Sequence, residues 1–233
     1  PFFDPSPAII LGLHKHVLTV QGVPEYKDGL GNPVPTSDWV EDMDVADVDE
    51  DGHPEILLAS YDGRAYVWDS NLAEEWKYPD RKGGPTIHAV CGLDIRWGTT
   101  ARMVIGSADG SVLALNPALE NKVVWRYQCQ RRVFALRTAD FRRREGDPPL
   151  YLIVVGSDDG SVHVLDTDGV LRWKYYVGDP VKWIEIFDID QDHEKEILVG
   201  ASDGSFLILD SEGDLELENQ LGDRIQGLQV ADI

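Results

Sequence analysis

The stretch DVDEDGHPEILLASYDGRAYVWD, residues 47–69, decides the fold of this chain. It opens with Asp at every second position and continues as two short apolar runs joined by Asp62-Gly63. Asp-Gly between two such runs is the strongest short-range signal for a β-hairpin. The stretch therefore predicts a loop followed by a hairpin. Whether it is one copy of a repeat has to be settled first, because a missed repeat leads to the wrong fold.

The same plan recurs along the chain. Each copy begins with an aspartate that has an apolar residue four positions before it, and the spacings between these aspartates are 47, 46, 48 and 44 residues. The reference aspartates are Asp47, Asp94, Asp140, Asp188 and Asp232. Further Asp-Gly pairs lie at 109–110, 159–160 and 203–204, and a tryptophan follows three of the hairpins, at Trp76, Trp125 and Trp173. The chain is therefore a repeat protein with a period of about 47 residues.

The two ends of the chain carry incomplete copies. The segment PAIILGLHKHVLTVQGVPEYKDG, residues 7–29, aligns with residues 54–80 but lacks the first strand of a copy, whereas residues 225–232 resemble a first strand alone. Counting across the join from Asp232 to Asp47 gives a step of 48, within the internal range. We therefore expect residues 225–232 to pair with residues 8–12 and to close a ring.

The runs of Val, Ile, Leu and aromatic residues between Gly, Asp and Pro clusters predict four strands in each copy. Four strands in about 45 residues is typical of a β-propeller, in which blades stack around an axis. The sequence thus predicts an all-β fold, a single β-propeller over residues 1–233 with five four-stranded blades. The expected blades are 1–38 plus 225–233, 39–86, 87–132, 133–181 and 182–224.

Composition limits the partners. The net charge is −21, which opposes nucleic acids and anionic membranes because binding to either depends on Lys and Arg. No apolar run reaches the length that crosses a membrane. Two cysteines, Cys91 and Cys129, are too few for a disulfide framework, and we expect them to be free. These features favour a soluble and cytoplasmic protein.

Two families share short motifs with this chain. The segments DVDEDGHPEI and DIDQDHEKEI resemble FG-GAP propeller repeats, found in integrin α-subunits and in scaffold proteins. The segments VLDTDGVLRWKY and DSNLAEEWKY resemble quinoprotein-like (PQQ-type) repeats. The resemblance extends over residues 39–233 and implies the propeller fold, but one fold hosts many activities.

The FG-GAP resemblance implies calcium in the loop after Asp47, because calcium takes six to eight oxygen ligands from a flexible loop. Gly52 permits the sharp turn, and the candidate ligands are Asp47, Asp49, Asp51, the carbonyl of His53 and Glu55. A weaker candidate site has His193 in place of the turn glycine and comprises Asp188, Asp190, Asp192 and Glu196.

A structural interpretation of these aspartates is favoured over calcium. The copies that begin at Asp94 and Asp140 keep only the first aspartate of the loop. That aspartate can accept bonds from backbone N–H groups a few residues on and so fix the turn between the first two strands. Metal binding is therefore not what the repeat requires.

No motif points to catalysis. The sequence has neither a Gly-rich phosphate loop ahead of a helix nor a G-x-S-x-G elbow. We therefore expect no enzyme; the alternative is a propeller hydrolase or lyase that builds its site from scattered channel residues. The recurring tryptophans can stack on sugars, but a residue repeated at one blade position more often packs between blades. Trp39 and Trp183 are less regular and are candidates for the mouth of the ring.

The basic residues are concentrated in one region. Seven of the 21 Lys and Arg lie between residues 126 and 144. The loop DFRRREGDPP, residues 140–149, is either ordinary solvated surface or a docking site for an acidic partner segment. The candidate partner-binding residues are Arg142, Arg143, Arg144, Arg131 and Arg132. We expect a non-enzymatic protein-interaction or scaffold propeller; the alternatives are a carbohydrate-binding, lectin-like propeller and a calcium-stabilised extracellular adhesion module.

Overall fold

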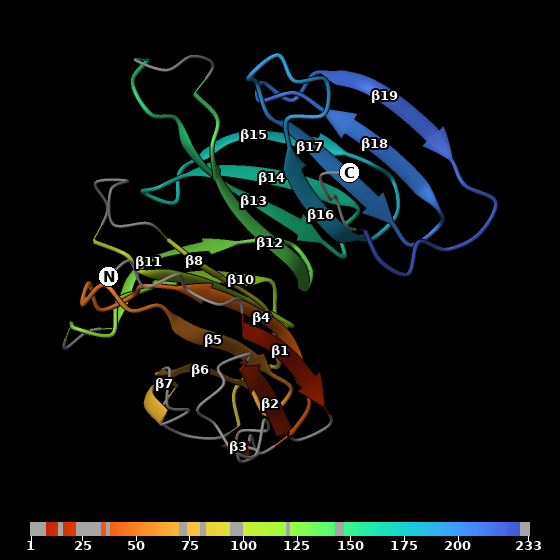
Figure 1. Cartoon of the computed structure of the whole chain (residues 1–233). Helices are drawn as coiled ribbons and strands as arrows, with labels where there is room; N and C mark the ends of the chain where they lie inside the picture. The colour runs from red at the N-terminus through yellow and green to blue at the C-terminus, as the bar shows by residue number, and fades with distance from the viewer. Residues whose placement is uncertain are drawn as a thin grey trace.

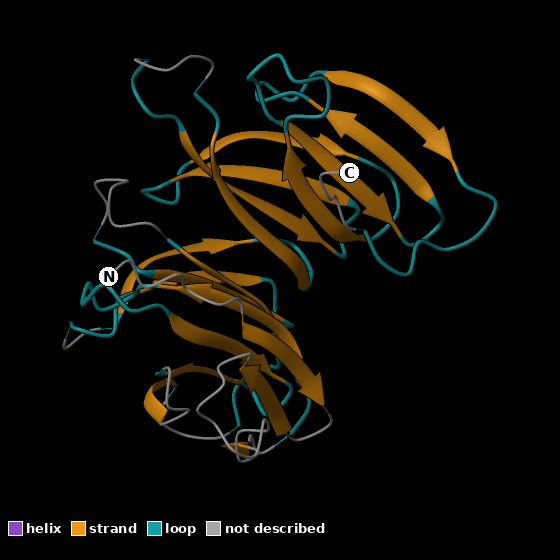
Figure 2. Ribbon diagram, in the orientation of Figure 1, coloured by secondary structure: helices purple, strands orange, loops and turns teal. Residues whose placement is uncertain are grey.

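The computed structural model describes residues 8–13, 16–21, 34–35, 38–69, 74–79, 83–93, 100–119, 122–142 and 147–228. Every regular element in these ranges is a β-strand, as Figure 2 shows. None of the described elements is a helix long and apolar enough to cross a membrane. The all-β prediction is confirmed for this part of the chain.

Four sheets each contain four antiparallel strands paired in sequence order (Figure 1). The first comprises β4 (Val40–Ala46), β5 (Glu55–Ser60), β6 (Arg64–Trp68) and β7 (Glu74–Tyr78). The second comprises β8 (Ile87–Gly92), β9 (Met103–Ser107), β10 (Ser111–Leu115) and β11 (Val123–Gln128). The third comprises β12 (Val133–Asp140), β13 (Tyr151–Ser157), β14 (Ser161–Asp166) and β15 (Leu171–Tyr176). The fourth comprises β16 (Val181–Phe187), β17 (Glu196–Ala201), β18 (Ser205–Leu209) and β19 (Leu215–Gln220).

These sheets stack as propeller blades. The first strand of each blade contacts the first strand of the next, in the order β4, β8, β12, β16, so these four are the inner strands. Three buried apolar clusters lie at the successive blade interfaces. Because neighbouring blades cover both faces of a middle strand, strands such as β9 and β10 of the second blade are buried along their whole length. This explains why they read as continuous apolar runs.

The Asp-Gly pairs form the predicted hairpin turns between the second and third strands. Gly63, Gly110, Gly160 and Gly204 have φ of 80°, 83°, 80° and 93°. This left-handed region is open to glycine at little cost and strains other residues. The repeat keeps glycine there because of this backbone conformation.

The recurring tryptophans join each blade to the next, as the packing interpretation predicted. Trp125 Nε1 donates to the carbonyl of Thr167 at 2.9 Å, and Trp173 Nε1 donates to that of Ser211 at 2.8 Å. Each ring lies against a turn glycine of the following blade: a Cβ added at Gly169 or Gly213 would fall 2.6 or 2.8 Å from it. These indoles are half-buried.

The predicted count of five blades is wrong: the structure has four four-stranded blades. The first copy forms a three-stranded sheet of β1 (Ala8–Leu13), β2 (His16–Gln21) and β3 (Val34–Pro35), in which β1 pairs with β2. Figure 1 shows this sheet at one end of a curved row and β16–β19 at the other, and Ile225 contacts the fourth blade. Residues 225–228 form no strand, and the rest of the predicted closing strand, 229–232, lies outside the described residues.

The beginning of the last copy nevertheless contacts the fourth blade as the inner strands contact the blades before them. Val133 lies over Gly106 and Val181 lies over Gly156, each on the blade before it. Ile225 lies in the same way over Gly200 of the fourth blade, and its carbonyl accepts a bond from Trp183 Nε1 at 3.1 Å. The contact between Ile225 and the fourth blade thus repeats the earlier blade interfaces.

Candidate functional site

The strand order gives the row of blades two rims. One, here called the hairpin rim, carries the turns at residues 61–63, 108–110, 158–160 and 202–204 and the links into the next inner strand. The other, here called the aspartate rim, carries the loops between first and second strands, including residues 47–54 and 188–195.

The loop after β4 brings three of its candidate ligands together. Carboxylate oxygens of Asp47, Asp49 and Glu55 lie within 4.8 Å of one another. Asp51 is not in this group, and its carboxylate accepts the N–H of His53 at 2.7 Å. The group is already hydrogen-bonded: Glu55 accepts the N–H of Val48 at 2.7 Å, and burial raises the pKa of its carboxyl.

The fourth blade repeats this arrangement. Carboxylates of Asp188, Asp190 and Glu196 come within 4.8 Å of one another. Asp192 is again outside the group, and it accepts the N–H of Glu194. His193 has a φ of 76°, in the place of Gly52 at 87°. The same backbone turn therefore forms with and without glycine.

The first aspartate of these loops caps the turn, as the structural interpretation predicted. Asp47 accepts the N–H groups of Glu50 and Gly52 at 2.8 and 3.1 Å. Asp188 accepts those of Asp192 and His193 at 3.1 and 3.0 Å. Asp140 accepts those of Arg142 and Leu150, both at 3.1 Å. Asp94 and Asp232 lie outside the described residues.

The basic candidates do not form one site. Arg131 and Arg132 precede β12 on the hairpin rim, whereas Arg142 follows β12 on the aspartate rim. Eight strand residues at about 3.3 Å each separate them by roughly 26 Å. Arg132 pairs with Asp158 at 3.5 Å and Arg142 pairs with Asp140 at 2.6 Å. Arg143 and Arg144 are among the residues that the structure does not describe.

The hairpin rim exposes two large aromatic residues whose backbones are hydrogen-bonded to each other. Trp39 is 54% exposed and Tyr61 is 53% exposed, and the N–H of Tyr61 donates to the carbonyl of Trp39 at 2.8 Å. Trp39 comes just before β4, and Tyr61 is in the turn after β5. The periodicity could not find this pair, because neither residue occupies a position that recurs as an aromatic.

A cavity of about 240 Å³ opens among the inner strands. The second residue of each inner strand lines it: Glu41, His88, Phe134 and Lys182, which we call the channel belt. Neighbours in the belt interact, with Glu41 3.5 Å from His88, the His88 ring 5.6 Å from Phe134, and the Lys182 ammonium 4.9 Å from the Phe134 ring centre.

The cavity also receives groups from deeper positions, namely Asp42, Arg137 and Trp183. Asp42 accepts the N–H of Val90 at 3.1 Å, and burial raises its pKa to about 6. Arg137 pairs with Glu185 at 3.0 Å. Trp183, a candidate for the mouth of the ring, lines this cavity. The sequence shows the repeat but not that the variable second position faces a cavity.

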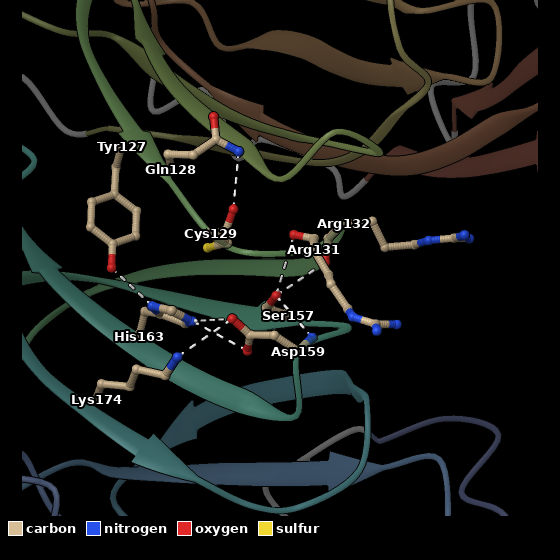
Figure 3. Close-up of polar contacts among 9 residues, drawn as sticks. All are labelled: Tyr127, Gln128, Cys129, Arg131, Arg132, Ser157, Asp159, His163 and Lys174. Atoms are coloured by element: carbon tan, nitrogen blue, oxygen red, sulfur yellow. Dashed lines mark hydrogen bonds and ion pairs between the residues drawn. The ribbon is translucent and has the colours of Figure 1, made fainter.

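A buried polar network joins the second and third blades (Figure 3). The hydroxyl of Tyr127 is 2.9 Å from Nδ1 of His163, and Nε2 of His163 is 3.2 Å from Asp159. Burial lowers the pKa of His163, so a neutral ring donates to Asp159 and accepts from Tyr127. Lys174 reaches the same carboxylate at 3.4 Å. Both ring nitrogens of His163 have partners within the interface between the second and third blades. The network therefore stabilises the fold.

Cys91 and Cys129 are free and buried, as the sequence predicted. Burial raises the pKa of Cys129 to about 12 and that of Cys91 well above its usual value. Both thiols are therefore protonated at neutral pH and act as small apolar residues in the core between the second and third blades.

Comparison with known proteins supports the propeller fold. Residues 32–122, fewer than half of the chain, match the family described as "Lambda-carrageenase beta-propeller domain". No curated protein matches the sequence. The likeness is therefore one of fold, and the FG-GAP and PQQ-type resemblance stays a prediction.

Solved structures share the fold at low sequence identity. The computationally designed Ika8 protein has a TM-score of 0.71 with 17% identity over 100% of this chain. BBS1N, solved in complex with ARL6DN, has 0.67 with 18% over 96%, and a chain of the Mitotic Checkpoint Complex has 0.68 with 13% over 96%. This chain spans 64%, 66% and 63% of those three chains, just under two thirds of each.

Proposed function

We propose that this chain is a non-enzymatic protein-interaction propeller whose partner docks on the hairpin rim at Trp39 and Tyr61. This proposal rests on the observation that two aromatic residues, each more than half exposed, occupy backbone positions that are hydrogen-bonded to each other. Trp is highly buried on average, and Trp and Tyr are enriched among the residues that dominate binding energy at protein interfaces. Two of the solved neighbours, BBS1N with ARL6DN and the Mitotic Checkpoint Complex, were determined as protein complexes, which supports the class of function.

The net charge of this chain indicates the charge expected on its partner. A net charge of −21 attracts a basic surface and repels an acidic one before contact is made. The partner segment that covers Trp39 and Tyr61 therefore carries Lys or Arg around an apolar centre. Association is faster at low salt and slows as salt is added.

Capture with a paired set of variants tests this proposal. Trp39→Ala combined with Tyr61→Ala removes the aromatic pair and should weaken partner binding by about 30-fold, as loss of an interface hot spot does. Tyr176→Ala is the matched control, because Tyr176 is 70% exposed at the end of the outer strand β15. Equal capture by the double variant and the unchanged protein would contradict the proposal.

The basic loop after β12 is the second candidate for docking, toward an acidic segment. Asp140 already pairs with Arg142, so this role depends on Arg143 and Arg144 as well. Reversal of all three arginines to Glu distinguishes the two candidates. The hairpin-rim proposal predicts unchanged capture in that variant, and a loss of capture confined to it would favour the basic loop.

We further propose that the aspartate loops take calcium as a stabilising ion, as an addition to the interaction function. The supporting observation is that three carboxylates converge in each of two equivalent loops. Calcium at about 1 mM should raise the melting temperature by mass action. Asp49→Asn should reduce the rise, whereas Asp51→Asn, outside the group, should keep it. An absent rise, or equal rises in the two variants, would leave these loops as hydrogen-bonded turns only.

A further inference from the structure

The channel cavity separates opposite charges on its two walls. Glu41 and Asp42 come from β4, the inner strand of the first blade. Lys182 comes from β16, the inner strand of the fourth, and lies over Phe134 of β12. Among the ion pairs of the described residues, none includes Lys182. The cavity therefore presents the carboxylates of β4 on one side and the Lys182 ammonium on the other, with the Phe134 ring of β12 between them, while the charge of Arg137 acts on Asp42.

The charges that face the cavity exclude ligands of a single sign. A purely cationic ligand would meet Lys182 and Arg137, and a purely anionic one would meet Glu41 and Asp42. Charged groups that leave water for such a cavity need a partner of opposite charge. A ligand with an ammonium and a carboxylate on the same small skeleton satisfies both walls at once.

The volume of the cavity and its lining residues further restrict the class of ligand that can bind. A volume of about 240 Å³ lies below that of the pockets that hold drug-sized ligands, about 300–1,000 Å³. Phe134 and Trp183 offer apolar surface in the cavity lining, and the Trp183 indole is already oriented by its bond to Ile225. The ligand is thus small, with an apolar part.

We propose that this cavity binds a free apolar α-amino acid, or a zwitterion of the same class. Its ammonium pairs with Glu41, its carboxylate pairs with Lys182, and its side chain packs on Phe134 and Trp183. This site goes beyond the docking of a protein on Trp39 and Tyr61 and does not depend on it.

Calorimetry with the unchanged protein provides the first test. Alanine, valine, leucine, methionine and phenylalanine are titrated singly at concentrations up to about 10 mM, where even a millimolar Kd is measurable. The strongest binder is then compared with its amide, which lacks the carboxylate, and with its N-acetyl derivative, which lacks the ammonium. Loss of binding with both derivatives supports the proposal. Absence of binding by all five, or binding retained by either derivative, overturns it.

Substitutions at Glu41 and Lys182 test which residue binds each charged group of the ligand. Glu41→Gln and Lys182→Gln should each raise the Kd about tenfold or more, the equivalent of about 1.4 kcal/mol. The matched controls are Glu218→Gln on the exposed strand β19 and Lys195→Gln in the loop before β17, both away from the cavity. An unchanged Kd in Glu41→Gln or Lys182→Gln, with the melting temperature preserved, places the ligand elsewhere. The Trp39 and Tyr61 double variant should bind the ligand normally, so failure of either proposal is distinguishable from failure of the other.

Discussion

At the scale of single residues, carboxylates of β4 connect the first blade to the second. Asp42 accepts the N–H of Val90, and Asp44 accepts that of Gly92 at 2.8 Å. The two bonds satisfy donors on the cavity side of β8 that the sheet ladder does not use. Asp42 is also the more perturbed group, because burial raises its pKa to about 6.

This pKa predicts how stability depends on pH. The folded state holds the proton of Asp42 more tightly than the unfolded state, whose value is 3.8. The contribution of Asp42 to the free energy of unfolding is therefore fully present below about pH 4 and is lost as pH rises through about 6. Asp42→Asn, which keeps an acceptor for Val90 N–H, should raise the free energy of unfolding at pH 7 by at most about 3 kcal/mol. Urea unfolding at pH 4 should show little of this gain, and an equal gain at both pH values would contradict the account.

Some single residues were predictable from the sequence and others were not. The turn-capping role of Asp47, Asp140 and Asp188 follows from short-range geometry, so the sequence was sufficient. The environment of Asp42 depends on β8, which is almost fifty residues away, and on the burial that the neighbouring blade imposes. No local pattern reports that distance.

At the scale of elements, the contact between a tryptophan and the next blade's turn glycine holds the blades together. Gly169 has a φ of 78° and faces the ring of Trp125. Gly178 has a φ of 111°, yet an added Cβ there meets nothing within 4 Å. The two glycines share backbone strain and differ in the ring contact.

This pair isolates the energy of the contact. Gly169→Ala should combine the left-handed penalty with overpacking against the indole, each about 1–3 kcal/mol. Gly178→Ala should show the backbone penalty alone. Denaturant unfolding of both variants measures the difference, and equal destabilisation would mean that the indole moves aside without cost.

The elements show where sequence reasoning succeeded. Strand pairing, hairpin turns and the interior position of the tryptophans followed from a pattern that recurs in every copy. The channel belt did not, because its four positions carry four different side chains. Repetition reveals residues that the fold requires, whereas a position that varies between copies is left free for binding and gives no periodic signal.

At the scale of the whole molecule, the repeat predicted blades but not how many would form. The expected ring relied on a step of 48 residues across the two chain ends. The structure instead places the three-stranded sheet beside β4, at the end of the row away from β16–β19. The spacing of the repeats along the sequence gives the number of residues in a blade. Closure of a ring depends instead on the angle between successive blades, which is set by the packing at each blade interface.

The arrangement of the whole molecule also determines which residues form the proposed docking surface. The arginine-rich region is continuous in sequence, yet β12 carries its two ends to opposite rims. Trp39 and Tyr61 are 22 positions apart and become neighbours because β4 and β5 are antiparallel. The proposed function therefore rests on a surface that only the folded chain assembles.

Photo-crosslinking at the hairpin rim tests that central claim most directly. Benzoylphenylalanine replaces Tyr61 in one protein and Val170 in a second, and both proteins are illuminated in a cell extract at low salt and again at moderate salt. Val170 is 58% exposed and lies between β14 and β15, on the aspartate rim. The account predicts a discrete covalent adduct with a basic protein at position 61, weaker at the higher salt and absent at position 170. The same adducts at both positions, or none at position 61, would contradict the assignment of the hairpin rim as the protein-binding surface.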